Sequence, residues 1–196
     1  MYPEISGTRK TGSEAFKSEG RQLPFDLLSF WQWSSSDLVG NALRGLLAEY
    51  IVAIAVGCSD RTRVEWNPYD LETPEGVRIE VKSGAYIQSW AQASLSRITF
   101  DIRPTQGWDA SRNTYSHQVK RQSDVYAFCL LEHRHQETVD PLNLDQWTFY
   151  VISTAKLNRF VGAQKTISLT ALLKLAPTEA RFSGIRPAVA EAAVDE

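Results

Sequence analysis

The chain has 196 residues, a formal net charge of −2 and 43% hydrophobic residues, as expected for one globular domain with a substantial core. Because the whole chain is not basic, any surface that binds nucleic acid must be a local patch. No apolar run reaches the roughly 18 residues of a membrane span, and Cys58 and Cys129 each lie in an apolar run. We therefore expect buried free thiols, no membrane partner and a cytoplasmic protein.

The N-terminal residues precede the first long apolar segment. Residues 1–22 are polar, and we expect a loosely ordered lead-in. Residues 23–33 are apolar and aromatic, which indicates a short helix or irregular arm that docks on the domain. A single domain is expected over residues 23–176. Residues 177–196 are rich in Ala and interrupted by Pro, so we expect a C-terminal tail that is ordered only in part.

A buried helix is predicted to follow. Three serines at residues 34–36 are suitable N-caps, and Gly57 is a suitable C-terminal stop. Within residues 45–59 the single charged residue is Glu49. A helix that is apolar nearly all round is buried, and a lone carboxylate in it needs a partner. Glu49 is then either a metal ligand or the partner of Arg44 or another base.

Residues 69–82 are the most informative segment, because they are typical of a tight β-hairpin. Residues 74–76 are Pro-Glu-Gly, in which Pro suits the first turn position and Gly accepts a left-handed backbone. In the resulting register Asp70 faces Glu80, and strand alternation places Lys82 on the same face as Glu80. Like charges about 5 Å apart repel each other. The pattern favours a divalent cation between the carboxylates, and the alternative is a solvated strand face with ordinary ion pairs.

Asp70, nine intervening residues and then Glu80-Val81-Lys82 together resemble the metal-binding motif of the PD-(D/E)XK nuclease superfamily. The proline that usually precedes the aspartate is displaced here to Pro68. The resemblance covers roughly residues 37–153. It implies an α/β restriction endonuclease-like core, in which a central mixed β-sheet is flanked by helices, and it supports Glu49 as a further residue of the metal site.

The remaining segments agree with an α/β fold. Residues 97–103 alternate as a strand with Ile98, Phe100 and Ile102 inward, while residues 124–131 and 147–152 have the aliphatic and aromatic composition of central strands. Residues 132–145 are charged and form an exposed excursion. Residues 168–175 are expected to form a short closing helix.

The resemblance implies a Mg²⁺-dependent nuclease, with Mn²⁺ as a substitute, that hydrolyses DNA phosphodiester bonds in restriction, phage defence or DNA repair. Asp70, Glu80, the Val81 carbonyl and Glu49 would be the metal ligands. Lys82 would orient the attacking water or neutralise developing charge. Hard oxygen ligands favour Mg²⁺ or Mn²⁺ over Zn²⁺.

Five further residues are candidates for substrate contacts. Ser83 and Gln88 follow the motif closely and are predicted to reach the phosphate or the metal's waters; the alternative is hydrogen bonding to nearby backbone. Residues 105–122 are predicted to be a loop in which basic and aromatic residues interleave, as suits contacts to phosphates and an unstacked base. Its candidate residues are Arg112, Lys120 and Arg121.

The expected partner is DNA, with RNA as the alternative, and a homodimer would suit cleavage of both strands of a duplex. Two other functions remain open. One is a nucleic-acid-binding module with the same fold that does not cut. The other is a structural or interaction domain in which the acids are only ion-paired.

Overall fold

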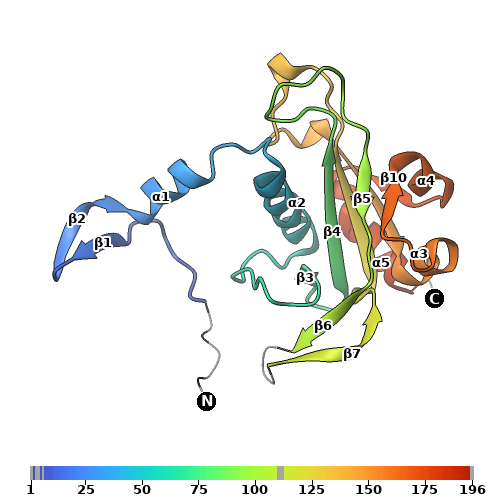
Figure 1. Ribbon diagram of the computed structural model, residues 1–196, viewed down its shortest axis with the longest axis horizontal. Helices are drawn as coiled ribbons and strands as arrows, with labels where there is room; N and C mark the ends of the chain where they lie inside the picture. Colours follow the sequence, from blue (N-terminus) through green and yellow to red (C-terminus); the bar gives the residue numbers. More distant parts are fainter. Residues whose placement is uncertain (1, 3–4, 6, 110–112, 195–196) are drawn as a thin grey trace.

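The computed structural model describes residues 2, 5, 7–109 and 113–194. Over these residues the central β-sheet has five strands in the order β11-β9-β8-β4-β3 (Figure 1). Strands β4 and β8 are parallel, and the other neighbouring pairs are antiparallel. Helices cover both faces, so the predicted α/β fold with a mixed central sheet is confirmed. The strands are β3 (Leu71–Glu72), β4 (Arg78–Ala85), β8 (Val125–Leu131), β9 (Trp147–Ser153) and β11 (Thr178–Ala180).

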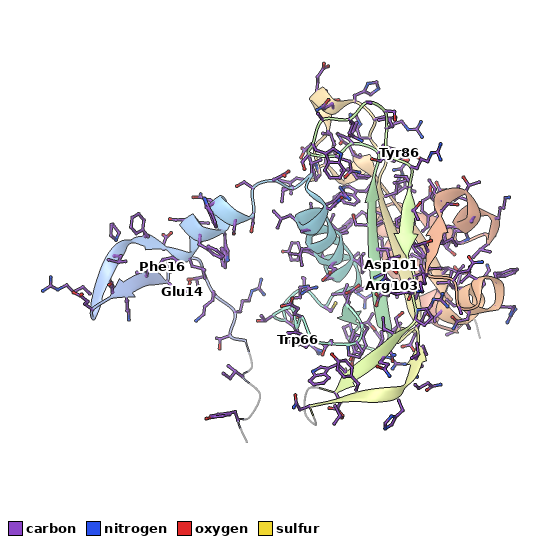
Figure 2. The ribbon with its side chains drawn as sticks, in the orientation of Figure 1. Glu14, Phe16, Trp66, Tyr86, Asp101 and Arg103 are labelled. Atoms are coloured by element: carbon purple, nitrogen blue, oxygen red, sulfur yellow. The ribbon has the colours of Figure 1, made fainter. Side chains whose placement is uncertain are left out.

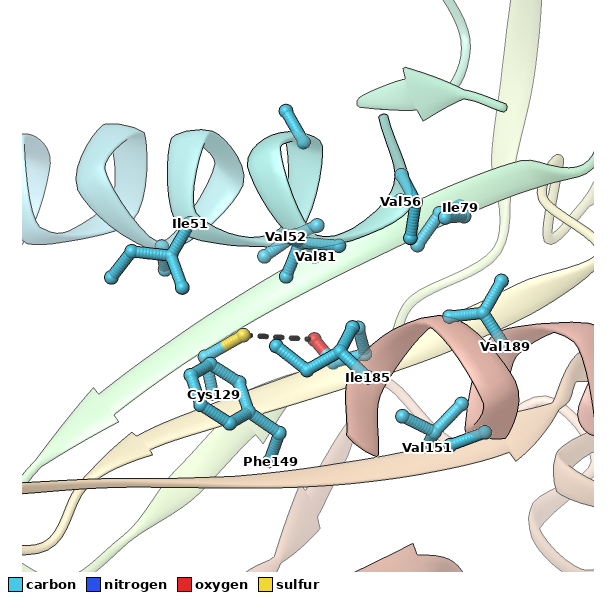
Figure 3. Close-up of a cluster of buried hydrophobic side chains, with 14 of the residues drawn as sticks. Ile51, Val52, Val56, Ile79, Val81, Cys129, Phe149, Val151, Ile185 and Val189 are labelled. Carbon is cyan, nitrogen blue, oxygen red and sulfur yellow. Dashed lines mark hydrogen bonds between the residues drawn. The ribbon is translucent and has the colours of Figure 1, made fainter. Parts of the chain in front are cut away.

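Helices α2 (Asn41–Val56) and α5 (Ile185–Val194) pack on one face of this sheet (Figure 3). Alternation along β4 turns Ile79 and Val81 toward α2, and both side chains are buried. The thiol of Cys129 is buried in the same cluster, and Cys58 is also buried and unbridged, as predicted. This core fixes the position of α2 relative to β4, and these two elements carry the candidate acids.

The opposite face is covered by a two-stranded ribbon and two short helices. The ribbon consists of β5 (Thr99–Asp101) and β10 (Thr166–Ser168), and the helices are α3 (Thr154–Val161) and α4 (Leu169–Lys174). Ile98, Phe100 and Ile102 are buried there, as predicted. Phe100 packs against Phe128 of β8 with ring centroids 5.0 Å apart. Helix α4 lies within the predicted closing helix.

The main helix begins later than the serine-rich residues 34–36 predict. Helix α1 (Leu27–Ser34) ends at the first of these serines, and α2 begins at Asn41. Between them the Asp37 carboxylate accepts a hydrogen bond of 3.0 Å from the Gly40 N–H, and this local turn delays the helix. Helix α2 ends where predicted, since Gly57 follows its last residue with a left-handed φ of 79°.

The N-terminal residues form an arm instead of docking on the domain. The N-terminal arm, residues 14–34, contains the hairpin of β1 (Ala15–Ser18) and β2 (Arg21–Asp26), followed by α1. Figure 1 shows it projecting away from the sheet. No residue of α1, all of which the structure describes, is buried. Its apolar composition therefore indicates a packing surface, but the prediction that this surface lies against the same domain is wrong.

The C-terminal residues differ from the expected tail. Strand β11 pairs with β9 at the edge of the central sheet, and α5 adds four side chains to the core. These side chains are spaced as one helical face, at Ile185, Ala188, Val189 and Ala192. Pro187 lies in the first turn of α5, where the missing N–H does not interrupt the helix.

Two paired antiparallel strands occur within residues 105–122, where a loop was predicted. These strands are β6 (Thr105–Asp109) and β7 (Thr114–Lys120), and every residue of β7 is exposed. Short 3₁₀ helices occur at Gln136–Thr138, Leu144–Gln146 and Phe182–Gly184. Within the described part of the chain, no helix is long and apolar enough to cross a membrane.

Candidate active site

The β3–β4 hairpin has the register that its turn residues predict. Leu71 pairs with Ile79, Glu72 pairs with Arg78, and Gly76 has a left-handed φ of 88°. One residue before β3, the Asp70 N–H donates a hydrogen bond of 3.1 Å to the Ile79 carbonyl. Turn chemistry therefore places Asp70 at the edge of the sheet, beside the middle of β4.

The surroundings of Asp70 perturb its carboxylate. Its Oδ2 accepts a hydrogen bond of 2.7 Å from the Val81 N–H. Burial, followed by repulsion from Glu80 and then from Glu49, raises the pKa of Asp70 to about 7, although the Val81 N–H and Lys82 act in the opposite direction. Asp70 is therefore close enough to both glutamates for their charges to oppose its ionisation.

Glu80 and Lys82 form an ion pair on β4, with Lys82 Nζ 2.5 Å from Glu80 Oε1. Their strand neighbours on β8 are Tyr126 and Phe128, so this pair lies on the sheet face opposite α2. Burial lowers the pKa of Lys82, but attraction to Glu80 and Asp70 outweighs burial and raises the pKa overall. Lys82 is consequently a firmly held cation beside two carboxylates.

Glu49 approaches Asp70 from the α2 side of the sheet. Arg63 donates two hydrogen bonds to it, of 2.5 Å from Nε and 3.2 Å from Nη2, and these bonds raise the pKa of Arg63. The Glu49 side chain is only 14% exposed. Glu49 and Asp70 line the same pocket, with a volume of about 530 Å³. The partner of Glu49 is therefore a base other than Arg44, and the carboxylate also lines the pocket that reaches Asp70.

Asp70 thus lies between two ion pairs, one on each side of the sheet edge. Three carboxylates, Glu49, Asp70 and Glu80, face two cations, Arg63 and Lys82, so the fully ionised site would carry a net charge of −1. In the part of the chain that the structure describes, no three carboxylate, imidazole or thiolate groups lie close enough together to hold a metal ion. The three acids approach a common region without forming a closed ligand set.

Two charged residues near these acids lie outside the sequence motif of the hairpin. Arg63 follows α2 in a loop, and it reaches Glu49 only because the chain turns back after Gly57. Asp101, at the end of β5, is near enough to Lys82 to add to the rise in the pKa of that lysine. Figure 2 shows Asp101 beside Arg103, and their charged groups are 2.7 Å apart. Neither residue is adjacent in sequence to the hairpin, so only the tertiary fold reveals them.

Ser83 and Gln88 are engaged in a different part of the molecule. Arg44, which is 4% exposed, donates hydrogen bonds of 3.2 Å to both Ser83 Oγ and Gln88 Oε1. Gln88 Nε2 donates to the Ala85 carbonyl at 2.8 Å. The bond to Ala85 is the backbone contact given as the alternative for Gln88, whereas the bonds from Arg44 tie β4 and the residues after it to the beginning of α2.

The three basic candidates of residues 105–122 have different outcomes. Arg121 is buried, and its guanidinium donates hydrogen bonds to Asn158 and to the carbonyls of Ile102, Gly162 and Gln164. This placement corrects the prediction of a phosphate contact: Arg121 joins the end of α3 to the β5 region. Lys120 is exposed at the end of β7. Arg112 lies outside the described residues.

Comparison with known families adds information that the geometry does not contain. Residues 26–171 match the family model described as Bacteriophage T4 endonuclease IV. The matched segment includes Glu49, the β3–β4 hairpin, and strands β8 and β9. No curated protein and no solved structure matches the chain. Because the match covers most of its length, the chain belongs to the bacteriophage T4 endonuclease IV family.

Proposed function

We propose that this protein is a nuclease that hydrolyses DNA phosphodiester bonds with Mg²⁺, or Mn²⁺ as a substitute, and that the β3–β4 hairpin is a PD-(D/E)XK motif on a restriction endonuclease-like core. The family supports hydrolysis of nucleic acid as the reaction, since the description of its model names an endonuclease. The single observation that carries the proposed site is the placement of Asp70, whose carboxylate is held by the Val81 N–H on the β3–β4 hairpin and lines the same pocket as Glu49.

The oxygen atoms at this site are of the kind that a hard divalent cation prefers. Asp70 and Glu80 offer carboxylate oxygens, and the Val81 carbonyl is a further oxygen on the same strand. A cation held there would relieve the repulsion that now opposes ionisation of Asp70. Such an ion, when bound, lowers the pKa of a coordinated water and stabilises negative charge on the phosphoryl oxygens.

Lys82 is the second functional group of the proposed site. Its ammonium is held beside Glu80 and attracted by Asp70 and Asp101, so it remains charged at neutral pH. We assign to it the orientation of the attacking water or the neutralisation of charge that develops on the phosphate. Glu49 would contribute its carboxylate once Arg63 releases it.

The β6–β7 hairpin is the proposed contact surface for the DNA. Trp108 and Tyr115 pack with ring centroids 4.7 Å apart, and Tyr115 is 62% exposed. Lys120 lies exposed on the same strand as Tyr115. Tyr115 offers an exposed ring on which an unpaired base can stack, and Lys120, five residues further along β7, offers a cation for the phosphate backbone. Cleavage of DNA by this protein in the cytoplasm would serve restriction, phage defence or DNA repair.

The proposal is tested by incubating plasmid and linear DNA with the protein in Mg²⁺, in Mn²⁺ and in EDTA. We expect cleavage with either cation, none in EDTA, and strong loss in Lys82→Ala and Asp70→Asn. Lys174→Ala, an exposed lysine of α4, is the matched control. Cleavage that is unchanged in both site variants would exclude the site, and retention of DNA without cleavage would favour a non-cleaving binding module.

A further inference from the structure

The N-terminal arm exposes an unusual amount of aromatic surface. Phe25 is 60% exposed and Trp33 is 84% exposed. Further apolar side chains of the arm are also exposed, and Figure 2 shows Phe16 on its hairpin, far from the sheet. The exposed apolar residues of the arm are Phe16, Leu23, Phe25, Leu28, Phe30, Trp31 and Trp33. A concentration of this kind marks an interaction surface.

The arm has too little internal packing to be stable by itself in water. Its hairpin has two short strands, Ala15–Ser18 and Arg21–Asp26, and isolated two-stranded hairpins are marginally stable at best. Its helix has 8 residues, which is too short for independent stability. The folded arm therefore requires a partner that covers its apolar side chains.

The charge of the arm favours a protein as that partner. Residues 14–34 contain two bases, Lys17 and Arg21, and three acids, Glu14, Glu19 and Asp26, for a net charge of −1. Nucleic acid and anionic membrane surfaces are bound through excess Lys and Arg. The arm lacks this excess, so its aromatic surface is suited to an apolar protein face.

The same chain presents such a face on α2. Leu46, Tyr50 and Ile54 are 41%, 51% and 43% exposed, and a spacing of four residues aligns them along one side of the helix. This α2 stripe lies opposite the buried residues that pack on β4. Figure 1 shows α2 on the side of the domain toward which the arm projects.

We propose that a second copy of this chain is the partner, and that two copies exchange arms so that the aromatic residues of each arm pack on the α2 stripe of the other copy. Exchange of an identical element is a low-cost route to a symmetric dimer. At about 150–250 Å² per aromatic side chain, the exposed fractions of the arm's five aromatic residues amount to roughly 500 Å² per copy. With the leucines and the backbone added, this approaches the roughly 800 Å² per partner of a stable interface.

The exchange would also complete the pocket that contains Glu49 and Asp70. Leu46 and Tyr50 belong both to the α2 stripe and to the lining of this pocket. The arm of the partner copy would therefore form an additional wall beside the candidate active site. This inference goes beyond the proposed nuclease function and does not depend on it.

The test is sedimentation equilibrium of the full chain, compared with variants on each side of the proposed contact. Ile54→Lys places a charge in the stripe outside the pocket lining, and Trp33→Ser removes the most exposed aromatic residue of the arm. We expect a dimer for the wild type and a dimer dissociation constant raised about tenfold or more by either variant, as for central aromatic contacts. Phe160→Ser, on α3, removes an aromatic residue that is 59% exposed and should leave the dimer unchanged.

Hydrogen exchange separates this model from an arm that folds back on its own α2. In the wild type the protection of α1 amides should rise with protein concentration, and Ile54→Lys should abolish that rise while its circular dichroism matches that of the wild type. A monomer over the whole concentration range, protection independent of concentration, or a dimer indifferent to both variants would overturn the proposal.

Discussion

The Val81 N–H donates a hydrogen bond of 2.7 Å to the Asp70 carboxylate across the β3–β4 hairpin. This bond holds Asp70 beside Glu80, where burial and repulsion raise its pKa to about 7. The hairpin thus maintains a carboxylate whose surroundings oppose its ionisation. Stability, cation affinity and the rate of cleavage should all depend on this electrostatic state.

Asp70→Asn should stabilise the protein in EDTA, and the gain should grow with pH. Because the pKa of Asp70 is higher in the folded state than its ordinary 3.8, the unfolded chain loses this proton first, and wild-type stability falls as the pH rises from about 4 to about 7. Asn keeps an acceptor for Val81 and has no charge. Urea unfolding should show a gain at pH 8, relative to pH 4, of roughly 2 to 4 kcal/mol.

Asp145→Asn is the matched control for this comparison, since Asp145 is an exposed aspartate in the 3₁₀ helix before β9. Its effect on the free energy of unfolding is measured at the same two pH values, and the gain for Asp70→Asn should exceed it at pH 8. An equal effect of Asp70→Asn at pH 4 and pH 8 would show that Asp70 ionises normally and that its surroundings do not oppose its charge.

Lys82→Ala should impair the chemical step more than it impairs DNA binding. Loss of a preorganised cation at the reacting phosphate costs about 10²–10³-fold in rate. Single-turnover cleavage measures this loss, while fluorescence anisotropy in Ca²⁺ measures affinity. Lys174→Ala should change neither quantity. A Lys82 variant that cleaves at the wild-type rate once DNA is saturating would show that the lysine only helps to bind substrate.

Arg63→Ala should increase the affinity for Mn²⁺, because it frees the Glu49 carboxylate and removes a nearby positive charge. The expected gain is roughly fivefold, about 1 kcal/mol for one charge at short range, and isothermal titration calorimetry measures it directly. The double variant Arg63→Ala/Glu49→Gln should lose most of the gain. If the double variant retains it, Glu49 does not help to hold the cation.

Tyr115→Ala should weaken the binding of single-stranded DNA. One stacked base is worth about 1–3 kcal/mol, so the dissociation constant should rise about fivefold or more when anisotropy is measured in EDTA. Phe160→Ala, which removes an exposed aromatic residue on α3, is the control. Equal affinities of wild type and Tyr115→Ala would remove the β6–β7 hairpin from the proposed DNA surface.

Local chemistry made part of this structure predictable. The register of the β3–β4 hairpin follows from Pro74 and Gly76 together with strand alternation, which act over a few residues. The strands β8 and β9 follow from their dense apolar composition. In contrast, the partner surface of the apolar arm cannot be predicted from nearby residues. The helix α5 was not predicted because Pro187 indicates an interruption, although the apolar residues around it have helical spacing.

The candidate site also contains residues that local sequence predicts and residues that only the tertiary fold brings together. Asp70, Glu80 and Lys82 lie within one hairpin, so their proximity is a short-range property. Arg63 and Asp101 come from other elements and depend on the tertiary fold. Arg121 was predicted as a phosphate contact from the basic composition of its segment, but carbonyls exposed at the end of α3 bind its guanidinium instead. Composition does not distinguish these two uses of an arginine.

A ¹³C NMR titration of the Asp70 carboxyl group, with and without Mg²⁺, would decide whether this hairpin holds a cation. We predict a pKa of about 7 in EDTA, and a pKa lower by more than one unit when Mg²⁺ is present, because the cation would supply the missing compensation. An Asp70 that titrates near 3.8 in EDTA, or whose pKa Mg²⁺ does not change, would contradict a cation site at this hairpin.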